Sequence, residues 1–474
     1  MNQKDPKILL GISLLVCIAT LTAAILKPEY LGDYYYLEVV IFTEIMVLAL
    51  WDYPARVFPL VVGIFLWAGT ALPLSDMWTA RRWFVLAIAA LGGLAIYVRD
   101  RRQQFSIFHM VAFFAVVAAA VSGVVSAFPK IAVLKALSLF LLFVYAATGA
   151  RLAALGREGR FFVGLLLGFE ILTYLAAVSY FLLRKEIFGN PNSLGAIFGV
   201  AVLPVLLWGV FVSEVKSLLR RRMFALGVAL LMLLSSYSRA GIAAAGISCV
   251  LLCVCLRRYR FLIRGALTAL LAALVIATVL PVQSDHPTSG LAQFIYKGAE
   301  RNDVLASRRS VWDMTVASIR RRPVFGSGFG TVATSYDAPT QIEGFISTAG
   351  TYREHGNSYL AIVEWVGLLG VVPFFAITLM NVRNAAKVLL WVRRTGDPFS
   401  PAVPLAAVVI AGVIHAAFED WMFAVGYYLC VFFWSCAFIL VDVLPQTAPV
   451  LVSSNAPLEF PSPASSIGIA VPGR

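Results

Sequence analysis

Three side chains are of types that could do chemistry together. Arg239 separates two apolar runs, Arg308 opens an amphipathic stretch, and His355 lies just before another apolar run. A guanidinium near hydrocarbon is costly, so it is usually paired or functional. Arginine is always charged and binds phosphate through two parallel hydrogen bonds, while a histidine with an ordinary pKa of about 6.5 suits proton transfer. These residue types are therefore suited to binding an anion and moving a proton.

Each of these residues also has a structural interpretation, which the sequence alone leaves open. Arg239 could extend its side chain to the membrane surface, and Arg308 with Arg309 could form a solvated basic face. A single histidine is more often structural than catalytic. His355 differs from the other histidines because it follows Glu354 in a polar run that directly precedes an apolar segment.

Composition excludes an ordinary soluble protein. The 474 residues are 60% hydrophobic and 13% charged, with a mean hydropathy of +0.86, whereas soluble domains are about half apolar and a quarter charged. We therefore predict an all-α polytopic membrane protein. The net charge of +13 is better explained by basic loops that orient membrane helices than by nucleic acid, and we expect no nucleic-acid partner. All six cysteines lie in apolar segments, so no disulfide framework is expected.

Fourteen segments are candidates for membrane spans, and twelve or thirteen spans would also fit because the shortest segments are near the lower length limit. The first could be a signal peptide, but it is long for one and many spans follow, so we interpret it as a transmembrane helix. The candidates are residues 8–26, 34–51, 57–74, 83–98, 107–128, 131–150, 161–183, 193–213, 223–238, 240–256, 261–282, 357–380, 402–418 and 423–441.

The distribution of basic residues predicts the orientation of the chain. With the N-terminus inside and alternating spans, 22 of the 38 Lys and Arg residues fall in inner segments, 8 in short outer segments and 8 in one large loop. Both termini are then cytoplasmic and the large loop lies outside the cytoplasm. The expected organisation is helices over 1–282, the large loop over 283–357, further helices over 358–445 and a disordered cytoplasmic tail over 446–474.

The large loop contains one clear amphipathic helix, predicted over residues 304–322 and ended by Pro323. The glycines of residues 326–330 permit a tight turn or a close backbone approach, and are only weak evidence for phosphate binding. A shared helical face is predicted for Arg308, Trp312, Thr315 and Ile319, with Arg309, Asp313 and Arg320 lying elsewhere.

Carboxylates within the apolar segments could mark a proton or ion path, or could pair with interior arginines. They are Glu38, Glu44, Glu170 and Glu364. A different polar motif, residues 190–193, resembles a helix start, with Asn or Ser as the cap.

Taken in order, these motifs resemble the superfamily of O-antigen ligases and polysaccharide polymerases, over about residues 185–425. The resemblance depends on order, spacing and topology rather than on any one motif. The matching features are Asn190-Pro191-Asn192, Ser238-Arg239-Ala240-Gly241, Arg308 four residues before Trp312, Pro323 before Gly326-Ser327-Gly328, His355 before Tyr359-Leu360, then Glu364, Gly367-Leu368-Leu369-Gly370, His415 and Glu419.

The resemblance implies an inner-membrane glycosyltransferase of the GT-C type that needs no nucleotide, metal or other cofactor. Its donor would be an undecaprenyl-diphosphate-linked saccharide used at the periplasmic face, with a glycan or lipid A-core as acceptor. Arg239 and Arg308, with Arg309 as a further candidate, would hold the diphosphate, and His355 would activate the acceptor hydroxyl. Supporting roles would fall to Asn192, Asn357, Tyr359, Glu364, His415 and Glu419. The family commonly places Asn directly after this histidine, whereas here Gly356 intervenes.

The predicted function is therefore transfer of a lipid-linked saccharide, either by a polymerase of O-antigen, capsule or exopolysaccharide or by a ligase of lipopolysaccharide. We favour the polymerase slightly. A polysaccharide or lipid flippase or transporter is the main alternative, although the two related halves common in transporters are not evident. A peptidoglycan polymerase, with an acidic catalytic residue such as Asp303, Asp313 or Asp337, fits the arginine and histidine pattern less well, and a purely structural membrane protein is a further alternative.

Overall fold

The computed structural model describes residues 53–72, 75–100, 105–279, 306–332 and 353–445, and within these ranges the chain is helical with no strand. The predicted all-α class is confirmed. Predicted spans 8–26 and 34–51, most of the large loop and the tail lie outside the described residues.

The helices are α3 (Tyr53–Ala68), α4 (Ser75–Asp100), α5 (Ile107–Val124), α6 (Pro129–Tyr145), α7 (Arg151–Ala154), α8 (Glu158–Ala177), α9 (Pro191–Ile197), α10 (Leu203–Phe211), α11 (Lys216–Ser235), α12 (Arg239–Cys255), α13 (Tyr259–Val279), α15 (Ala306–Arg321), α16 (Ser358–Thr395), α17 (Ala402–His415) and α18 (Tyr428–Asp442), with π-helical turns η2 (Ala146–Ala150), η3 (Val178–Leu182) and η4 (Phe198–Val202).

Most of these helices form one bundle, and their lengths suit a membrane. Six of the described helical stretches are long and apolar enough to cross a bilayer, and four more are apolar but shorter. The chain is therefore a multi-pass membrane protein. Every predicted span within the described residues coincides with a helix, because long apolar runs leave the backbone no other way to satisfy its hydrogen bonds in lipid.

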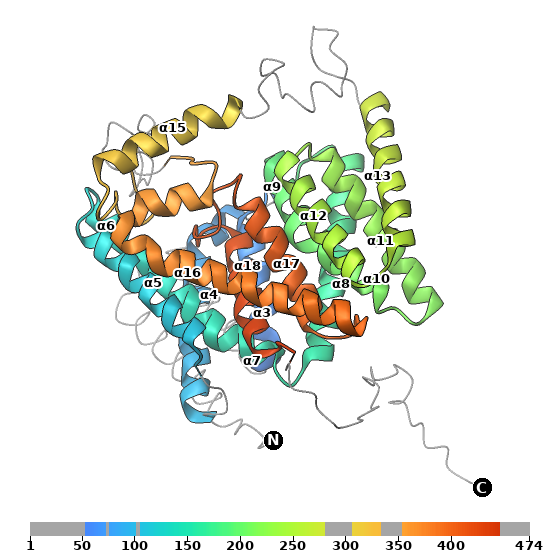
Figure 1. Cartoon of the computed structure of the whole chain (residues 1–474), viewed down its shortest axis with the longest axis horizontal. Coiled ribbons are helices and arrows are strands. Elements are labelled where there is room, and N and C mark those ends of the chain that lie inside the picture. Colours follow the sequence, from blue (N-terminus) through green and yellow to red (C-terminus); the bar gives the residue numbers. More distant parts are fainter. Residues whose placement is uncertain (1–52, 73–74, 101–104, 280–305, 333–352, 446–474) are drawn as a thin grey trace, which may run out of the picture.

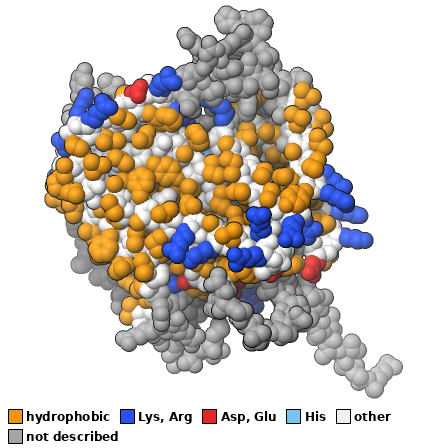
Figure 2. Space-filling model, in the orientation of Figure 1, with side chains coloured by type: hydrophobic (Ala, Val, Ile, Leu, Met, Phe, Trp, Pro, Cys, Tyr) orange, Lys and Arg blue, Asp and Glu red, His pale blue; other side chains and the backbone are white. Residues whose placement is uncertain are grey.

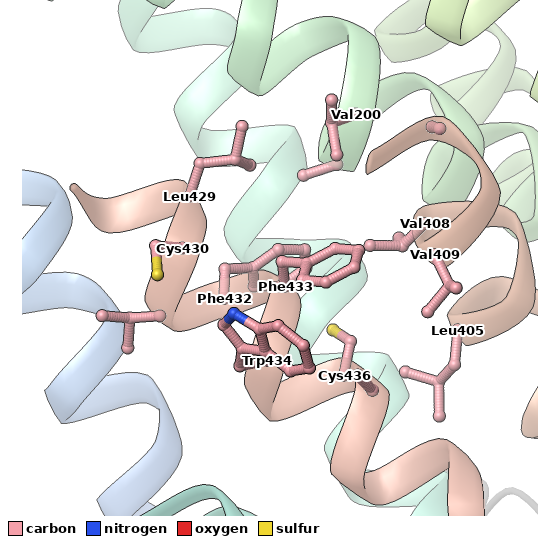
Figure 3. Packing of buried hydrophobic residues seen from close by; sticks show 14 of the residues in the cluster. Val200, Leu405, Val408, Val409, Leu429, Cys430, Phe432, Phe433, Trp434 and Cys436 are labelled. Atoms are coloured by element: carbon pink, nitrogen blue, oxygen red, sulfur yellow. The ribbon is translucent and has the colours of Figure 1, made fainter. Parts of the chain in front are cut away.

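The centre of the bundle is α18, whose residues from Tyr428 to Leu440 are all buried. A helix that is apolar all round is stable only when neighbours cover every side. Figure 3 shows how this works: Phe432, Phe433 and Trp434 project from α18 among aliphatic side chains such as Val200 and Val408. Figure 1 places α17 and α18 between a group containing α4, α5 and α6 and a second group containing α9 to α13.

The outer helices present large apolar side chains to the surroundings. Phe114 of α5, Leu175 of α8 and Leu270 of α13 are each more than half exposed. Figure 2 shows these apolar side chains as a broad face, with Lys and Arg gathered below it and again above its upper left edge. An apolar face of this extent between two basic edges matches the hydrocarbon core of a bilayer between its two surfaces.

The described helix α16 is broken at Gly367, which has φ 66° and ψ −177°. Residues 358–366 form a short first part, and residues 368–395 form the longer second part. The chain after α15 fills the break: Ser327 and Gly328 donate backbone hydrogen bonds to the carbonyls of Glu364 and Trp365, at 2.8 and 3.0 Å. The predicted span 357–380 coincides with the N-terminal portion of α16, which continues to Thr395, while the break at Gly367 depends on a contact with a distant loop that is invisible to hydropathy.

Candidate active site

Helix α15 presents the predicted face to the rest of the protein. Thr315 is fully buried, and Trp312 donates from its Nε1 atom to the carbonyl of Gly356 at 3.3 Å. Arg309 and Asp313, which lie on the other side of the helix, are exposed. Figure 1 shows α15 lying across one end of the bundle rather than through it. The amphipathic helix predicted for 304–322 is thus confirmed, and it brings Arg308 but not Arg309 onto the buried face.

Arg308 is held by two carboxylates at this end of the bundle. Its Nη1 atom lies 3.1 Å from Glu354 and its Nη2 atom 2.5 Å from Glu419. The Arg308 side chain keeps about a fifth of its surface exposed, Glu354 is mostly exposed and Glu419 is largely buried. Burial raises the pKa of Glu419, while the charge of Arg308 lowers it. An anion entering here could replace the exposed Glu354 and still find a fixed guanidinium.

Gly356 explains the departure from the family pattern. Its backbone has φ 59°, and a Cβ atom placed there would lie 2.7 Å from the Nη1 atom of Arg308. Asparagine tolerates the left-handed region, but its side chain would displace the arginine. Glycine therefore lets Arg308 pack against the backbone next to His355.

His355 is fully buried between two carboxylates. Its Nε2 atom lies 3.1 Å from Glu364 and its Nδ1 atom 3.2 Å from Asp420. Burial lowers the pKa of the imidazole, but the hydrogen bonds and charges of Asp420 and Glu364 outweigh this, and the net effect is a raised pKa. The ring is therefore set up to hold a proton, with Asp420 as its more exposed partner.

Glu364 connects this histidine to α15. One carboxylate oxygen accepts from the hydroxyl of Ser318 at 2.9 Å, and the other pairs with Arg353. Because Arg353 and Glu364 are both buried, the attraction between their charges offsets part of the energy that is needed to take each charge out of water. The predicted alternative that an apolar-segment carboxylate pairs with an interior arginine is confirmed here, and likewise for Glu170, which lies 3.8 Å from the buried Arg222.

Several of the predicted supporting residues make local structural contacts. Asn357 caps α16 by accepting from the backbone of Tyr359 and Leu360 at 2.8 and 3.1 Å. The hydroxyl of Tyr359 donates to the carbonyl of Val413 at 2.7 Å, and buried His415 accepts from the indole of Trp421 at 2.8 Å. These contacts build the walls of the site.

At the start of α9, the backbone of Asn192 donates to the side chain of Asn190 at 2.8 Å. Asn190 is thus the N-cap, which is one of the caps that the sequence predicts, and Pro191 is the first helical residue.

The glycine-rich turn over 326–330 is part of the scaffold. Ser327, Phe329 and Thr331 are buried, and a Cβ on Gly326 would lie 2.5 Å from the backbone oxygens of Glu364 and Trp365. These glycines serve a close backbone approach, one of the two roles predicted for them.

Arg239 is the first residue of α12, with Ser238 as N-cap and Gly195 of α9 packed against that serine. A turn of three residues joins α12 to α13, so Arg239 lies at the same end of the bundle as Val279, the end from which the chain continues toward α15 (Figure 1). The structure brings Arg308, Glu364 and Glu419 together around His355, and it sets Arg239 at the same end on a separate helix.

Two residues of this cluster, Arg353 and Asp420, were missed as site residues by sequence reasoning. Arg353 lies two positions before His355, and Asp420 directly follows Glu419. An arginine in the polar run and an acidic pair after His415 were the available signals, but only the fold brings positions 355 and 420 together.

The helical bundle, with one charged cluster under a surface helix, defines a class: a multi-pass membrane protein with a polar centre at one of its two membrane surfaces. No curated protein matches the sequence. A family model does: residues 224–375 match Wzy_C, described as O-antigen ligase. This match, which contains Arg239, Arg308, His355 and Glu364, supports membership of the Wzy-like superfamily of O-antigen ligases and polymerases. It supports a polysaccharide ligase or polymerase role.

Proposed function

We propose that the protein transfers a saccharide from an undecaprenyl-diphosphate-linked donor to an acceptor hydroxyl. The observation that carries this is the placement of Arg308 beside the His355 cluster, with Gly356 between them. This placement supports an anion ligand and a proton acceptor that act within one small region at a membrane surface. Such pairing suits a reaction with an anionic leaving group and a hydroxyl nucleophile.

The reaction needs three things from these residues. The bond between the sugar C1 atom and the diphosphate oxygen breaks, and the lipid diphosphate leaves with its electron pair, stabilised by Arg308 and Arg239. A new bond forms between C1 and the acceptor oxygen. The hydroxyl proton passes to neutral His355, and the imidazolium that forms is stabilised by Glu364 and Asp420, which face its Nε2 and Nδ1 atoms. Exposed Arg309 contributes at most general attraction.

The proposed setting is the bacterial inner membrane, with both termini in the cytoplasm and the site at the periplasmic surface. The distribution of Lys and Arg supports this orientation, since the N-terminal part of α11 (Arg220, Arg221 and Arg222) and the α12–α13 connection (Arg257 and Arg258) lie at the end away from α15. The large loop of about residues 283–357 then supplies α15 and His355 to the outer surface.

A complementation assay tests the function. Wild type, Arg239→Ala, Arg308→Ala and His355→Ala are expressed in a host that lacks its own enzyme, with Arg258→Ala, exposed at the other end of the bundle, as the matched control. Gels of lipopolysaccharide and secreted polysaccharide are expected to show polymer only with wild type and control. If the inactive variants still make lipid-linked polymer but attach none to the lipopolysaccharide core, the protein is a ligase. If they make single repeat units in place of long chains, it is a polymerase. Unchanged glycan with all three variants at normal expression would favour the flippase or transporter.

A further inference from the structure

The proposed base is enclosed by carboxylates in this structure. Both nitrogens of the His355 ring face carboxylate oxygens, Nδ1 toward Asp420 at 3.2 Å and Nε2 toward Glu364 at 3.1 Å, and the ring is fully buried. A general base must present a lone pair within about 2.6–3.2 Å of the hydroxyl that it deprotonates. One of the two carboxylates therefore has to leave the ring before an acceptor hydroxyl can reach it.

The Asp420 side of the ring is fixed by several contacts. The oxygen of Asp420 that faces Nδ1 also accepts from the backbone N–H of His355 at 2.9 Å. The ring of Trp365 packs edge-on against the imidazole, with a centroid distance of 5.4 Å and an interplanar angle of 86°. Moving Asp420 would break two contacts at once, and Trp365 limits rotation of the imidazole. Nδ1 is therefore the nitrogen that keeps its partner.

The Glu364 side is held differently, because three donors share one carboxylate. Its Oε1 atom accepts from the hydroxyl of Ser318 at 2.9 Å, while its Oε2 atom contacts both the Nη2 atom of Arg353 and the Nε2 atom of His355. A carboxylate has lone pairs for about four hydrogen bonds, so it can lose one donor and stay hydrogen-bonded. Glu364 can thus leave His355 without becoming an isolated buried charge.

Arg353 has unused hydrogen-bonding capacity beside Glu364. Its side chain is only 8% exposed, and its Nε and Nη1 atoms have no hydrogen-bond acceptor among the residues that the structure describes. A buried N–H group without an acceptor is unfavourable, and a guanidinium binds a carboxylate best through two parallel hydrogen bonds. The contact with Glu364 through Nη2 leaves that paired arrangement unmade.

Moving from His355 to Arg353 therefore costs Glu364 little. Turned fully onto Arg353, the carboxylate exchanges the imidazole for a second guanidinium N–H group, which otherwise has no acceptor among the described residues. In both positions the negative charge stays next to a buried cation, so burial of charge does not oppose the exchange.

We propose that Arg353 is a positioning residue that draws Glu364 off the Nε2 atom of His355, and that this movement exposes Nε2 as the base for the acceptor hydroxyl. The hydroxyl proton then passes to Nε2, while Nδ1 stays on Asp420. This inference rests on the proposed function and adds a form of regulation to it: before the movement, Glu364 blocks the base.

Charged groups approach this imidazole from three elements, and only Glu364 of α16 changes its contact with the ring. Asp420 comes from the loop before α18. Arg308 comes from α15, where Glu354 and Glu419 pair with it. Because these other contacts stay in place, the pH at which His355 loses its proton measures where Glu364 lies.

Variants on the two sides of Glu364 should move that pH in opposite directions. Arg353→Lys keeps a cation for Glu364 but removes the guanidinium fork, so Glu364 stays on His355 and the ring loses its proton at higher pH. Ser318→Ala removes the hydroxyl that holds the other oxygen, so Glu364 turns onto Arg353 and the ring loses its proton at lower pH. A general loss of packing would not produce opposite shifts.

The ring can be followed directly, because the chain contains only four histidines. The full chain with isotopically labelled histidine is placed in phosphatidylcholine bilayers and titrated by solid-state NMR, and the His355→Gln variant assigns the signal. Shifts of about one pH unit are expected, since a nearby charge moves a pKa by that much or more. Glu364→Gln should lower the midpoint, and Arg353→Lys added to Glu364→Gln should have no further effect.

Transfer kinetics in proteoliposomes give a second readout. The donor is the undecaprenyl-diphosphate-linked saccharide extracted from the complementation host, and the host's lipopolysaccharide core and lipid-linked repeat units are supplied as acceptors. Arg353→Lys should lower kcat about tenfold, leave KM unchanged and move the acid limb of the pH profile upward. The matched control is Arg151→Lys, the same exchange in a buried pair with Asp442 at the other end of the bundle (Figure 1), which should leave the limb unmoved.

Two results would overturn the inference. One is a His355 titration that moves in neither Arg353→Lys nor Ser318→Ala. The other is a rise in KM at unchanged kcat in Arg353→Lys, which would make Arg353 a substrate ligand. Thermal unfolding shows which variants are folded, and if Arg353→Lys is not, Ser318→Ala and Glu364→Gln decide. The expected titration shifts in a protein that transfers no sugar would support the movement of Glu364 and contradict the proposed function.

Discussion

The backbone N–H and the ring Nδ1 atom of His355 both face one carboxylate oxygen of Asp420, at 2.9 and 3.2 Å. This double contact joins the loop before α16 to the loop before α18, 65 positions further along the chain. It fixes the orientation of the imidazole and, with Glu364 on the opposite side, favours the charged ring. The histidine is thus the central residue of the site as well as the proposed base.

Transfer should require the neutral form of His355 and should therefore depend on pH. Because the neighbouring carboxylates raise the pKa of the imidazole above 6.5, activity is expected to rise with pH along a limb whose midpoint lies above 6.5. Asp420→Asn removes one of the groups that raise this pKa and should move the limb to lower pH. The pH profile of kcat in proteoliposomes measures both, and a limb unmoved by Asp420→Asn would contradict the assignment.

The raised pKa of His355 predicts that stability falls with rising pH, whereas activity rises. A group with a raised folded-state pKa contributes stability that is fully present below its unfolded pKa and is lost as pH rises through the folded value. The wild type should therefore lose part of its stability above pH 6.5, and His355→Gln should lose less over that window. Thermal unfolding at a series of pH values compares the two proteins. An equal dependence of Tm on pH in both would contradict a buried imidazolium.

Arg308 and Arg309 should differ sharply although they are neighbours. Arg308→Ala removes a charge that faces the His355 cluster and should cost about 2–4 kcal/mol of transition-state stabilisation, roughly 30-fold to 10³-fold in rate. Arg309→Ala acts on an exposed side chain and should cost less than about tenfold, since a surface charge is screened. Initial transfer rates at equal expression provide the comparison, and similar losses in both variants would mean that α15 does not select between them.

Gly356→Ala should disturb both stability and activity. A Cβ is unfavourable at φ 59° by about 1–2 kcal/mol, and it would meet the Nη1 atom of Arg308 at 2.7 Å. We expect a lower Tm together with weaker transfer. Gly246→Ala, on an exposed helical surface with nothing within 4 Å, is the matched control and should leave both unchanged or slightly raise Tm. Normal transfer by Gly356→Ala would show that the close approach of Arg308 is dispensable.

Arg353→Ala should be among the most damaging single changes to the fold. It leaves Glu364 buried without its cation, and breaking a buried pair in this way costs about 3–5 kcal/mol. Adding Glu364→Gln should recover part of the loss, because the uncompensated charge is then removed. Detergent-based denaturation of the two single variants and the double variant gives the coupling, and strict additivity would mean that the pair does not interact.

The sequence contains enough local information for most of the fold. Apolar runs located the spans, and the spacing of Arg308, Trp312 and Thr315 located α15, because burial on one face requires that period. The polar cluster was only half predictable. Arg308 and His355 stand out by type, whereas the contacts of Asp420 with His355 and of Glu354 with Arg308 depend on chain segments meeting in space. The break at Gly367 is likewise set by backbone from the loop after α15.

That break has a mechanical consequence. In a continuous helix each added residue turns everything beyond it by about 100°, so a longer or shorter span would swing Glu364 away from His355. At Gly367 the two parts of α16 are no longer in helical phase, and Glu364 takes its register from the loop that contacts it. A second part of another length, matched to a bilayer of different thickness, would therefore leave Glu364 facing His355.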